Sequence, residues 1–137
     1  MTYIDLRIMR RRTFLLPCLL FALMANGCQP GANSSNEILI GHYASMTGSE
    51  ATFGISTDNG IKMAVEELNA AGGIRGRKVK LITYDDKGDA REAGTAVTRL
   101  VTKDGVVAVI GEVASGLSLA AAPICQEASI PMISPSS

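Results

Sequence analysis

Apolar positions follow two different spacings from residue 38 onward. Short, nearly continuous apolar runs occupy residues 38–44, 79–84, 106–110 and 131–133, as in strands covered by helices. Between these runs, apolar residues recur every three or four positions, which is the spacing of one helix face. The residues at this spacing are Ile61, Ala64, Val65 and Leu68, then Ala93, Ala96, Val97 and Leu100, then Leu117, Ala121, Ile124 and Ala128. The pattern predicts four strands alternating with three helices.

Residues at the ends of these stretches agree with the predicted boundaries. Asp89 and Glu92 have the spacing of a capping box at a helix start. Gly72-Gly73 and Gly105 stand where glycine can take the left-handed conformation that ends a helix. Residues 106–110 are apolar at every position, which predicts a strand covered on both faces.

The alternation of strand and helix with short connections predicts an α/β fold. We expect a parallel sheet with right-handed crossovers, helices on both faces and the strand order 2-1-3-4. Leu100 and Val109 are expected in the core. Ligands of such sheets bind beyond the carboxyl ends of the strands. Four segments should meet there: residues 44–48, 85–88, 111–115 and 134–137.

The predicted edge carries acidic residues but no nucleotide-binding motif. Residues 44–48 match neither the dinucleotide-binding glycine pattern nor a P-loop. Asp85-Asp86 could hold a metal or accept a phosphoryl group, but a phosphate-accepting receiver domain needs further acids where Ser45 and Glu112 stand. The favoured interpretation is that both aspartates are solvated loop carboxylates, and no metal site is predicted.

Serines at the same edge predict a binding site for a carboxylate. Ser115 begins the third helix, where free N–H groups, the helix dipole and its own hydroxyl could hold an anion. The alternative is that Ser115 only caps its helix. Residues 134–137, Ser-Pro-Ser-Ser, add hydroxyls and backbone donors.

No residue at this edge has the surroundings of a catalyst. The single histidine, His42, lies inside the first strand and is interpreted as a packed strand residue. Cys125 lies on the third helix and is interpreted as a small buried apolar residue. We therefore expect binding without catalysis, and no cofactor.

The N-terminal segment has the layout of an export signal. Residues 1–27 contain basic residues followed by about 13 mostly apolar ones, fewer than the roughly 20 that span a bilayer. The apolar run ends at Gly27-Cys28, which resembles a bacterial lipobox, so lipidation of Cys28 is expected, with ordinary cleavage as the alternative. Arg11-Arg12 also resembles a twin-arginine export motif. The polar residues 28–36 are expected to form a tether.

Composition and charge indicate a folded domain without the excess of basic residues that is typical of nucleic-acid binding. The 137 residues are 47% hydrophobic, which suits one folded domain, and carry no net charge. Four of the 13 basic residues but only one of the 13 acidic residues lie in residues 1–27, which leaves the rest at about −3. This balance does not favour nucleic acid as a partner.

Several motifs occur in an order that resembles one protein family. Residues 37–137 are similar to the periplasmic leucine/isoleucine/valine-binding proteins, the substrate-binding components of branched-chain amino-acid ABC transporters, which have the type I periplasmic binding fold. The segments that carry the resemblance are Ile38–Gly41, Met46–Gly48, Asn59–Lys78, Tyr84–Asp86, Val109–Gly111 and Ile130–Pro135.

The resemblance implies a ligand and a set of contacts. Ser115 would bind the α-carboxylate of the ligand, Ser136 and Ser137 would add backbone groups and hydroxyls, and Phe53 would flank the ligand. A disulfide found in some members would need cysteines at Gly88 and Ala114. Residues 37–137 would form part of the first of two lobes, so the chain is expected to be an N-terminal fragment.

The implied function is capture of a branched-chain amino acid or related small solute for import, with no enzymatic activity. The implied partners are an ABC permease and, through the lipid on Cys28, the membrane of an exported protein. One alternative is a sensory module of the same fold that reports an amide or an amino acid. A flavodoxin-like α/β enzyme is a less favoured alternative, because it would need a nucleotide loop or a catalytic group.

Overall fold

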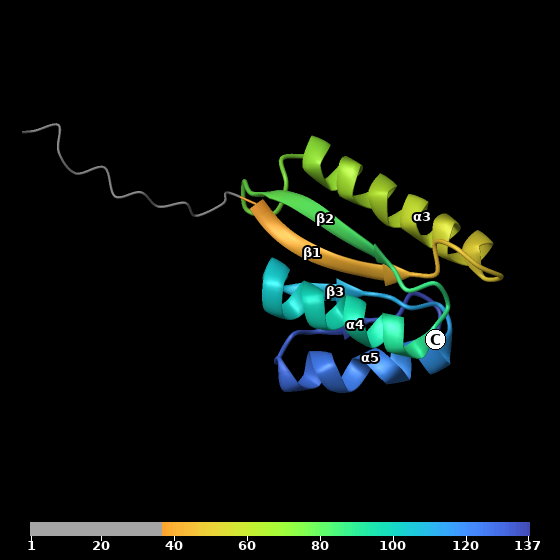
Figure 1. The fold of residues 1–137 in the computed structure, drawn as a ribbon. Coiled ribbons are helices and arrows are strands. Elements are labelled where there is room, and N and C mark those ends of the chain that lie inside the picture. The colour runs from red at the N-terminus through yellow and green to blue at the C-terminus, as the bar shows by residue number, and fades with distance from the viewer. Residues whose placement is uncertain (1–36) are drawn as a thin grey trace, which may run out of the picture. The chain divides into compact units, whose positions relative to one another are not determined.

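A four-stranded parallel sheet forms the centre of residues 37–137, the part of the chain that the computed structural model describes. The strand order is β2-β1-β3-β4, and every neighbouring pair is parallel, as predicted (Figure 1). The strands are β1 (Glu37–Ala44), β2 (Lys78–Asp85), β3 (Ala108–Ile110) and β4 (Met132–Ile133). The predicted signal, tether and Cys28 lie outside the described residues.

Helices lie on both sides of the sheet. Helix α3 (Ala51–Ala70) packs on β1 and β2, whereas α4 (Ala90–Arg99) and α5 (Ser115–Glu127) pack together on the opposite face (Figure 1). A short π-helical segment, Leu100–Asp104, continues α4. Helix α3 begins ten residues before Ile61, the first residue of the predicted apolar spacing. Periodicity did not predict these first turns, because they carry no apolar stripe.

The predicted ends of α4 are confirmed. The side chain of Asp89 accepts hydrogen bonds from the backbone N–H groups of Arg91 and Glu92. Gly105 ends the π-helical segment with a φ of 66°, a left-handed conformation that favours glycine. Asp89 therefore begins α4, and Gly105 ends the segment that leads to β3, as predicted.

The main core lies between the sheet and the pair α4 and α5. Leu100 and Val109 are 0% and 1% exposed, as expected, and Cys125 is a buried free thiol. Ile124 is half-buried, but Ala128 is exposed and does not face the core as predicted, because α5 ends at Glu127. The other fully enclosed members include Tyr43, Ala93, Val97 and Ala121.

The prediction that β3 is covered on both faces is wrong for the described residues. Val109 is buried against the helices, but Val107, just before the strand, is 54% exposed. Helix α3 covers only β1 and β2, which leaves an apolar groove of about 390 Å³ between α3 and the sheet. Its lining includes Ile61, Val65 and Leu68 of α3 and Ile40, Ala108, Ile110 and Ile133 of the sheet.

Within residues 37–137, no helix has the combination of length and apolar character that a membrane crossing requires.

Candidate functional site

The four predicted loop segments meet at the carboxyl ends of the strands. The N–H of Met46, after β1, donates to Asp85 Oδ1 at the end of β2, over 2.9 Å. The N–H of Ser45 donates to Glu112 Oε1, after β3, over 3.0 Å. The Ser134 hydroxyl, after β4, donates to the carbonyl of Glu112 over 2.7 Å. The C-terminal residues lie at this same end of the sheet (Figure 1).

Ser115 is the first residue of α5 and is exposed. The residue before it, Ala114, occupies the N-cap position, and no side chain caps the helix. The alternative in which Ser115 only caps its own helix is therefore not what the structure has. Among the described residues, the Ser115 hydroxyl makes no hydrogen bond, so it is available to a ligand at the positive end of the helix dipole.

Ser136 and Ser137 lie on the loop next to the start of α5. The Ser136 hydroxyl donates to the carbonyl of Val113 over 3.2 Å, and the Ser137 hydroxyl donates to that of Glu112 over 3.0 Å. Both residues are exposed. These bonds hold the loop after β4 against the residues that lead into α5. We call Ser115, Ser136 and Ser137 together the serine site.

Phe53 lies on the first turn of α3 and is 62% exposed. Helix α3 starts just after β1, so Phe53 is at the same end of the sheet as the serine site. Within the described residues, no hydrogen bond links the first turn of α3 to the serine site. The structure therefore places Ser136 and Ser137 against the residues just before Ser115 and leaves Phe53 on a separate element.

Asp85 organises the loop after β1. Its carboxylate accepts hydrogen bonds from the N–H groups of Met46, Thr47 and Lys87 and from the Thr47 hydroxyl, at 2.7–3.3 Å. Burial raises the pKa of Asp85, but these four donors outweigh it and leave the pKa below its ordinary value. Asp85 is thus a structural brace rather than a solvated carboxylate.

Asp86 contradicts the interpretation as a solvated carboxylate more strongly, because it is 0% exposed. Its Oδ1 accepts from the Ser45 hydroxyl and from the N–H of Gly88, each over 2.9 Å. Burial and the neighbouring charges of Glu112 and Asp85 raise the pKa of Asp86, although these two hydrogen bonds oppose the change. The loop after β2 folds inward, which residue type alone did not indicate.

Glu112 is the site residue that sequence reasoning missed. It is 1% exposed, and its Oε2 accepts from the N–H of Ala114 over 2.6 Å. Its carboxylate joins β1 to the start of α5, and its carbonyl receives the serine hydroxyls after β4. A glutamate directly after an apolar strand and a glycine was the available signal.

The remaining candidates have packing roles. His42 is fully buried, and its Nδ1 lies 2.9 Å from the carbonyl oxygen of Ile110, which confirms the packed strand residue. No group of three or more His, Cys, Asp or Glu residues in the described part of the chain could hold a metal ion.

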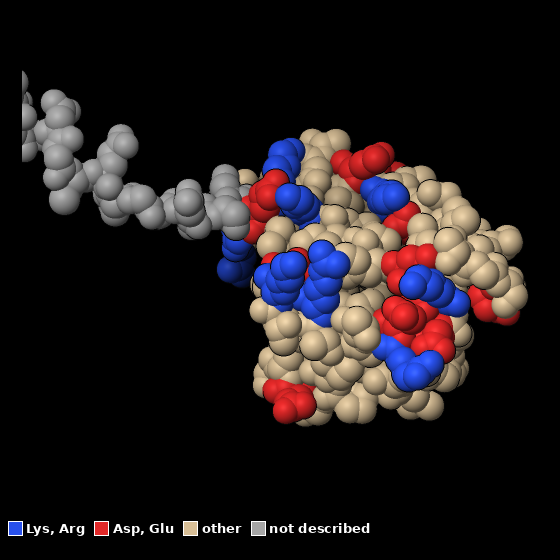
Figure 2. All heavy atoms as spheres, in the orientation of Figure 1, with Lys and Arg blue, Asp and Glu red and all other residues tan. Residues whose placement is uncertain are grey.

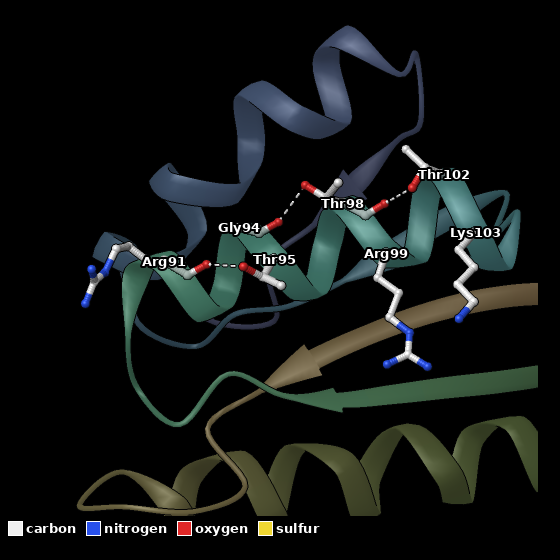
Figure 3. Close-up of a pocket in the computed structure, with 7 residues that line it drawn as sticks. All are labelled: Arg91, Gly94, Thr95, Thr98, Arg99, Thr102 and Lys103. Atoms are coloured by element: carbon white, nitrogen blue, oxygen red, sulfur yellow. Dashed lines mark hydrogen bonds between the residues drawn. The ribbon is translucent and has the colours of Figure 1, made fainter.

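A second surface depression runs along α4 and the segment that follows it, from Arg91 to Lys103 (Figure 3). The hydroxyls of Thr95, Thr98 and Thr102 each donate to the carbonyl four residues earlier and so face their own helix. The Arg99 guanidinium lies 4.5 Å from the centre of the Tyr84 ring. On the face shown in Figure 2, basic and acidic side chains are interspersed, and no broad surface of one sign forms there.

The sequence matches those of known binding proteins over the described residues. The family described as "Periplasmic binding protein" matches residues 37–137. An "Amino acid binding protein" of Pseudomonas aeruginosa is 38% identical over 101 residues, which are 74% of this chain and 27% of the relative. A "Leu/Ile/Val-binding protein" of Escherichia coli is 35% identical over 101 residues, again 74% and 27% of the two chains.

Solved structures of binding proteins have the same fold. The branched-chain amino acid transporter substrate-binding protein LivJ of Streptococcus pneumoniae, in complex with isoleucine, has a TM-score of 0.72 and 40% identity over 73% of this chain and 29% of its own. A solute-binding protein of an ABC transporter from Rhodopseudomonas palustris, in complex with 3,4-dihydroxybenzoic acid, has a TM-score of 0.68 and 27% identity over 74% and 27%.

This chain spans less than a third of the length of these relatives. Its four parallel strands and three helices match part of the fold of the solved binding proteins. Because the family match covers every described residue, the chain belongs to the periplasmic binding protein family.

Proposed function

We propose that this chain contributes one wall of the ligand site in the substrate-binding component of an ABC transporter. That component would capture a branched-chain amino acid or a related small solute for an ABC permease. The observation that carries the proposal is the exposed start of α5. There Ser115, whose hydroxyl makes no hydrogen bond within residues 37–137, closely follows Glu112 and Val113, to which Ser137 and Ser136 bond. Membership of the periplasmic binding protein family supports it.

The chemistry of the serine site suits the carboxylate of such a solute. The first N–H groups of α5 and the helix dipole favour an anion, and a serine hydroxyl adds a neutral donor. The exposed ring of Phe53 offers apolar surface at the same end of the sheet. Isoleucine and 3,4-dihydroxybenzoic acid, bound by two of the structural neighbours, are both carboxylic acids.

Replacing Ser115 with alanine should weaken ligand binding in the full-length protein. Loss of one hydrogen bond to a charged group costs about 1.5–3 kcal/mol, or about 10- to 150-fold in the dissociation constant. Calorimetric titration against a panel of amino acids measures this change. The control is Thr98→Ala, which removes a hydroxyl that donates to the Gly94 carbonyl within α4, a different helix from the one that Ser115 begins. An affinity within twofold of wild type for Ser115→Ala would show that Ser115 does not contact the ligand.

We also propose that residues 1–27 direct export, that Cys28 carries lipid and that residues 28–36 tether the domain to the membrane. The apolar run that ends at Gly27-Cys28 supports this division, as does the periplasmic family. Cys28→Ser should move the protein from the membrane fraction to the soluble fraction. Cys18→Ala is the control, since it changes another cysteine of the same segment. A membrane fraction unchanged by Cys28→Ser would exclude the anchor.

A further inference from the structure

Ser45, Asp86 and Glu112 form a buried polar cluster next to the serine site. All three are 0–1% exposed. The Ser45 hydroxyl lies 2.9 Å from Asp86 Oδ1 and 3.3 Å from Glu112 Oε1. The Ser45 hydroxyl therefore has a single proton to donate and two carboxyl groups within hydrogen-bond distance.

No cation neutralises this pair within residues 37–137. The ion pairs of the described chain involve other carboxylates, and the nearby Lys87 pairs with the exposed Glu92. The titratable groups near the cluster are Asp85, which is next to Asp86 in the sequence, and Tyr43 on β1. Cys125 on α5 in turn lies close to Tyr43. None of these supplies positive charge. Two buried carboxylates that share one hydroxyl partner repel strongly, so one carboxyl should hold a proton.

Hydrogen bonding distinguishes the two carboxyl groups. Glu112 accepts from the N–H groups of Ser45 and Ala114, and Ala114 is the N-cap of α5, where the helix dipole favours negative charge. Asp86 uses only Oδ1, because its buried Oδ2 has no partner. A proton on Oδ2 would displace no hydrogen bond. Burial and the adjacent charges of Glu112 and Asp85 also raise the pKa of Asp86.

We propose that Asp86 stays protonated in the folded protein and that the remaining negative charge, on Glu112, positions the loop that presents Ser115. Glu112 is then a positioning residue, which acts on a ligand only through the serine site. Its carboxylate holds the start of α5 to β1, and its carbonyl holds Ser134 and Ser137. The effect on ligand affinity rests on the function proposed above, whereas the protonation of Asp86 does not.

Two isosteric variants separate the roles. Asp86→Asn imitates the protonated acid and should leave the dissociation constant for leucine within about twofold of wild type. Glu112→Gln replaces one acceptor with a donor that faces the N–H of Ser45 or of Ala114. It should weaken leucine binding in the full-length protein at least about tenfold. The control is Glu92→Gln, which removes an exposed carboxylate.

A pH profile of stability tests the proton without any ligand. Below about pH 4, the ordinary pKa of aspartic acid, Asp86 is protonated in both the folded and unfolded chains. As pH rises from there toward the raised folded pKa of Asp86, the unfolded chain loses this proton while the folded chain still holds it, so stability is lost across that interval. The urea midpoint of wild type should therefore fall relative to that of Asp86→Asn as pH rises above about 4.

Two results would overturn the proposal. One is a constant difference between these midpoints from pH 4 to 8, which would mean that Asp86 ionises normally. The other is an Asp86→Asn variant that binds leucine as weakly as Glu112→Gln. If the wild-type protein does not bind leucine at all, the proposed ligand class is wrong, and the pH profile alone then decides the protonation of Asp86.

Discussion

Replacing Gly54 with alanine is expected to destabilise the fold by about 3 kcal/mol, at the upper end of typical overpacking costs. Gly54 is buried in α3, where the helix crosses the loop after β1. A Cβ atom there would lie 2.1 Å from the carbonyl oxygen of Ser45 and 2.6 Å from its carbonyl carbon. Backbone cannot rotate aside as a flexible side chain can, so α3 would have to move away from the sheet.

The same helix provides a matched control at Gly60, where a Cβ atom would meet nothing within 4 Å. Gly60→Ala should stabilise the protein by about 0.5–1 kcal/mol, because alanine favours the helix interior. Urea unfolding of both variants measures the difference. Equal midpoints for Gly54→Ala and wild type would show that α3 does not approach Ser45 this closely.

Replacing Leu100 with alanine should cost about 2–5 kcal/mol. Leu100 is 0% exposed and packs directly on β1, where a Cβ atom at Gly41 would lie only 2.9 Å from Leu100 Cδ1. Because Gly41 has no side chain that could fill the space left by truncation, we expect a value in the upper half of the range.

Leu119 is the control for Leu100, because it is a leucine on α5 that is 73% exposed. Leu119→Ala should change the free energy of unfolding by no more than about 0.5 kcal/mol. A loss of less than about 1 kcal/mol for Leu100→Ala would contradict the core assigned here.

The elements could be predicted from sequence because local chemistry agreed with the final packing. Asp89 caps α4, Gly105 ends the segment after it, and the apolar runs alternate with helical stretches, which leaves few topologies open. Coverage of β3 could not be predicted in this way. An apolar strand indicates what it would bury, but not whether a helix among the described residues lies over it.

The candidate site was predictable only in part. The position of Ser115 follows from topology, because a helix that starts after a parallel strand begins at the binding edge. The burial of Asp86 and Glu112 does not follow from topology, because acidic residues in loops are usually solvated. These two residues are 26 positions apart in the sequence, and their burial depends on both of their loops meeting Ser45. No local pattern in the sequence indicates that contact.

The open groove between α3 and the sheet affects how stability varies with temperature. Unfolding raises the heat capacity mainly because apolar surface becomes hydrated, by about 0.45 cal/K/mol for each Å². In the folded chain Leu68 and Ile133, which line the groove, are already 38% and 68% exposed. This face therefore adds less to the heat-capacity increment than the face under α4 and α5. The stability curve of the described residues is accordingly shallower than that of a sheet covered on both faces.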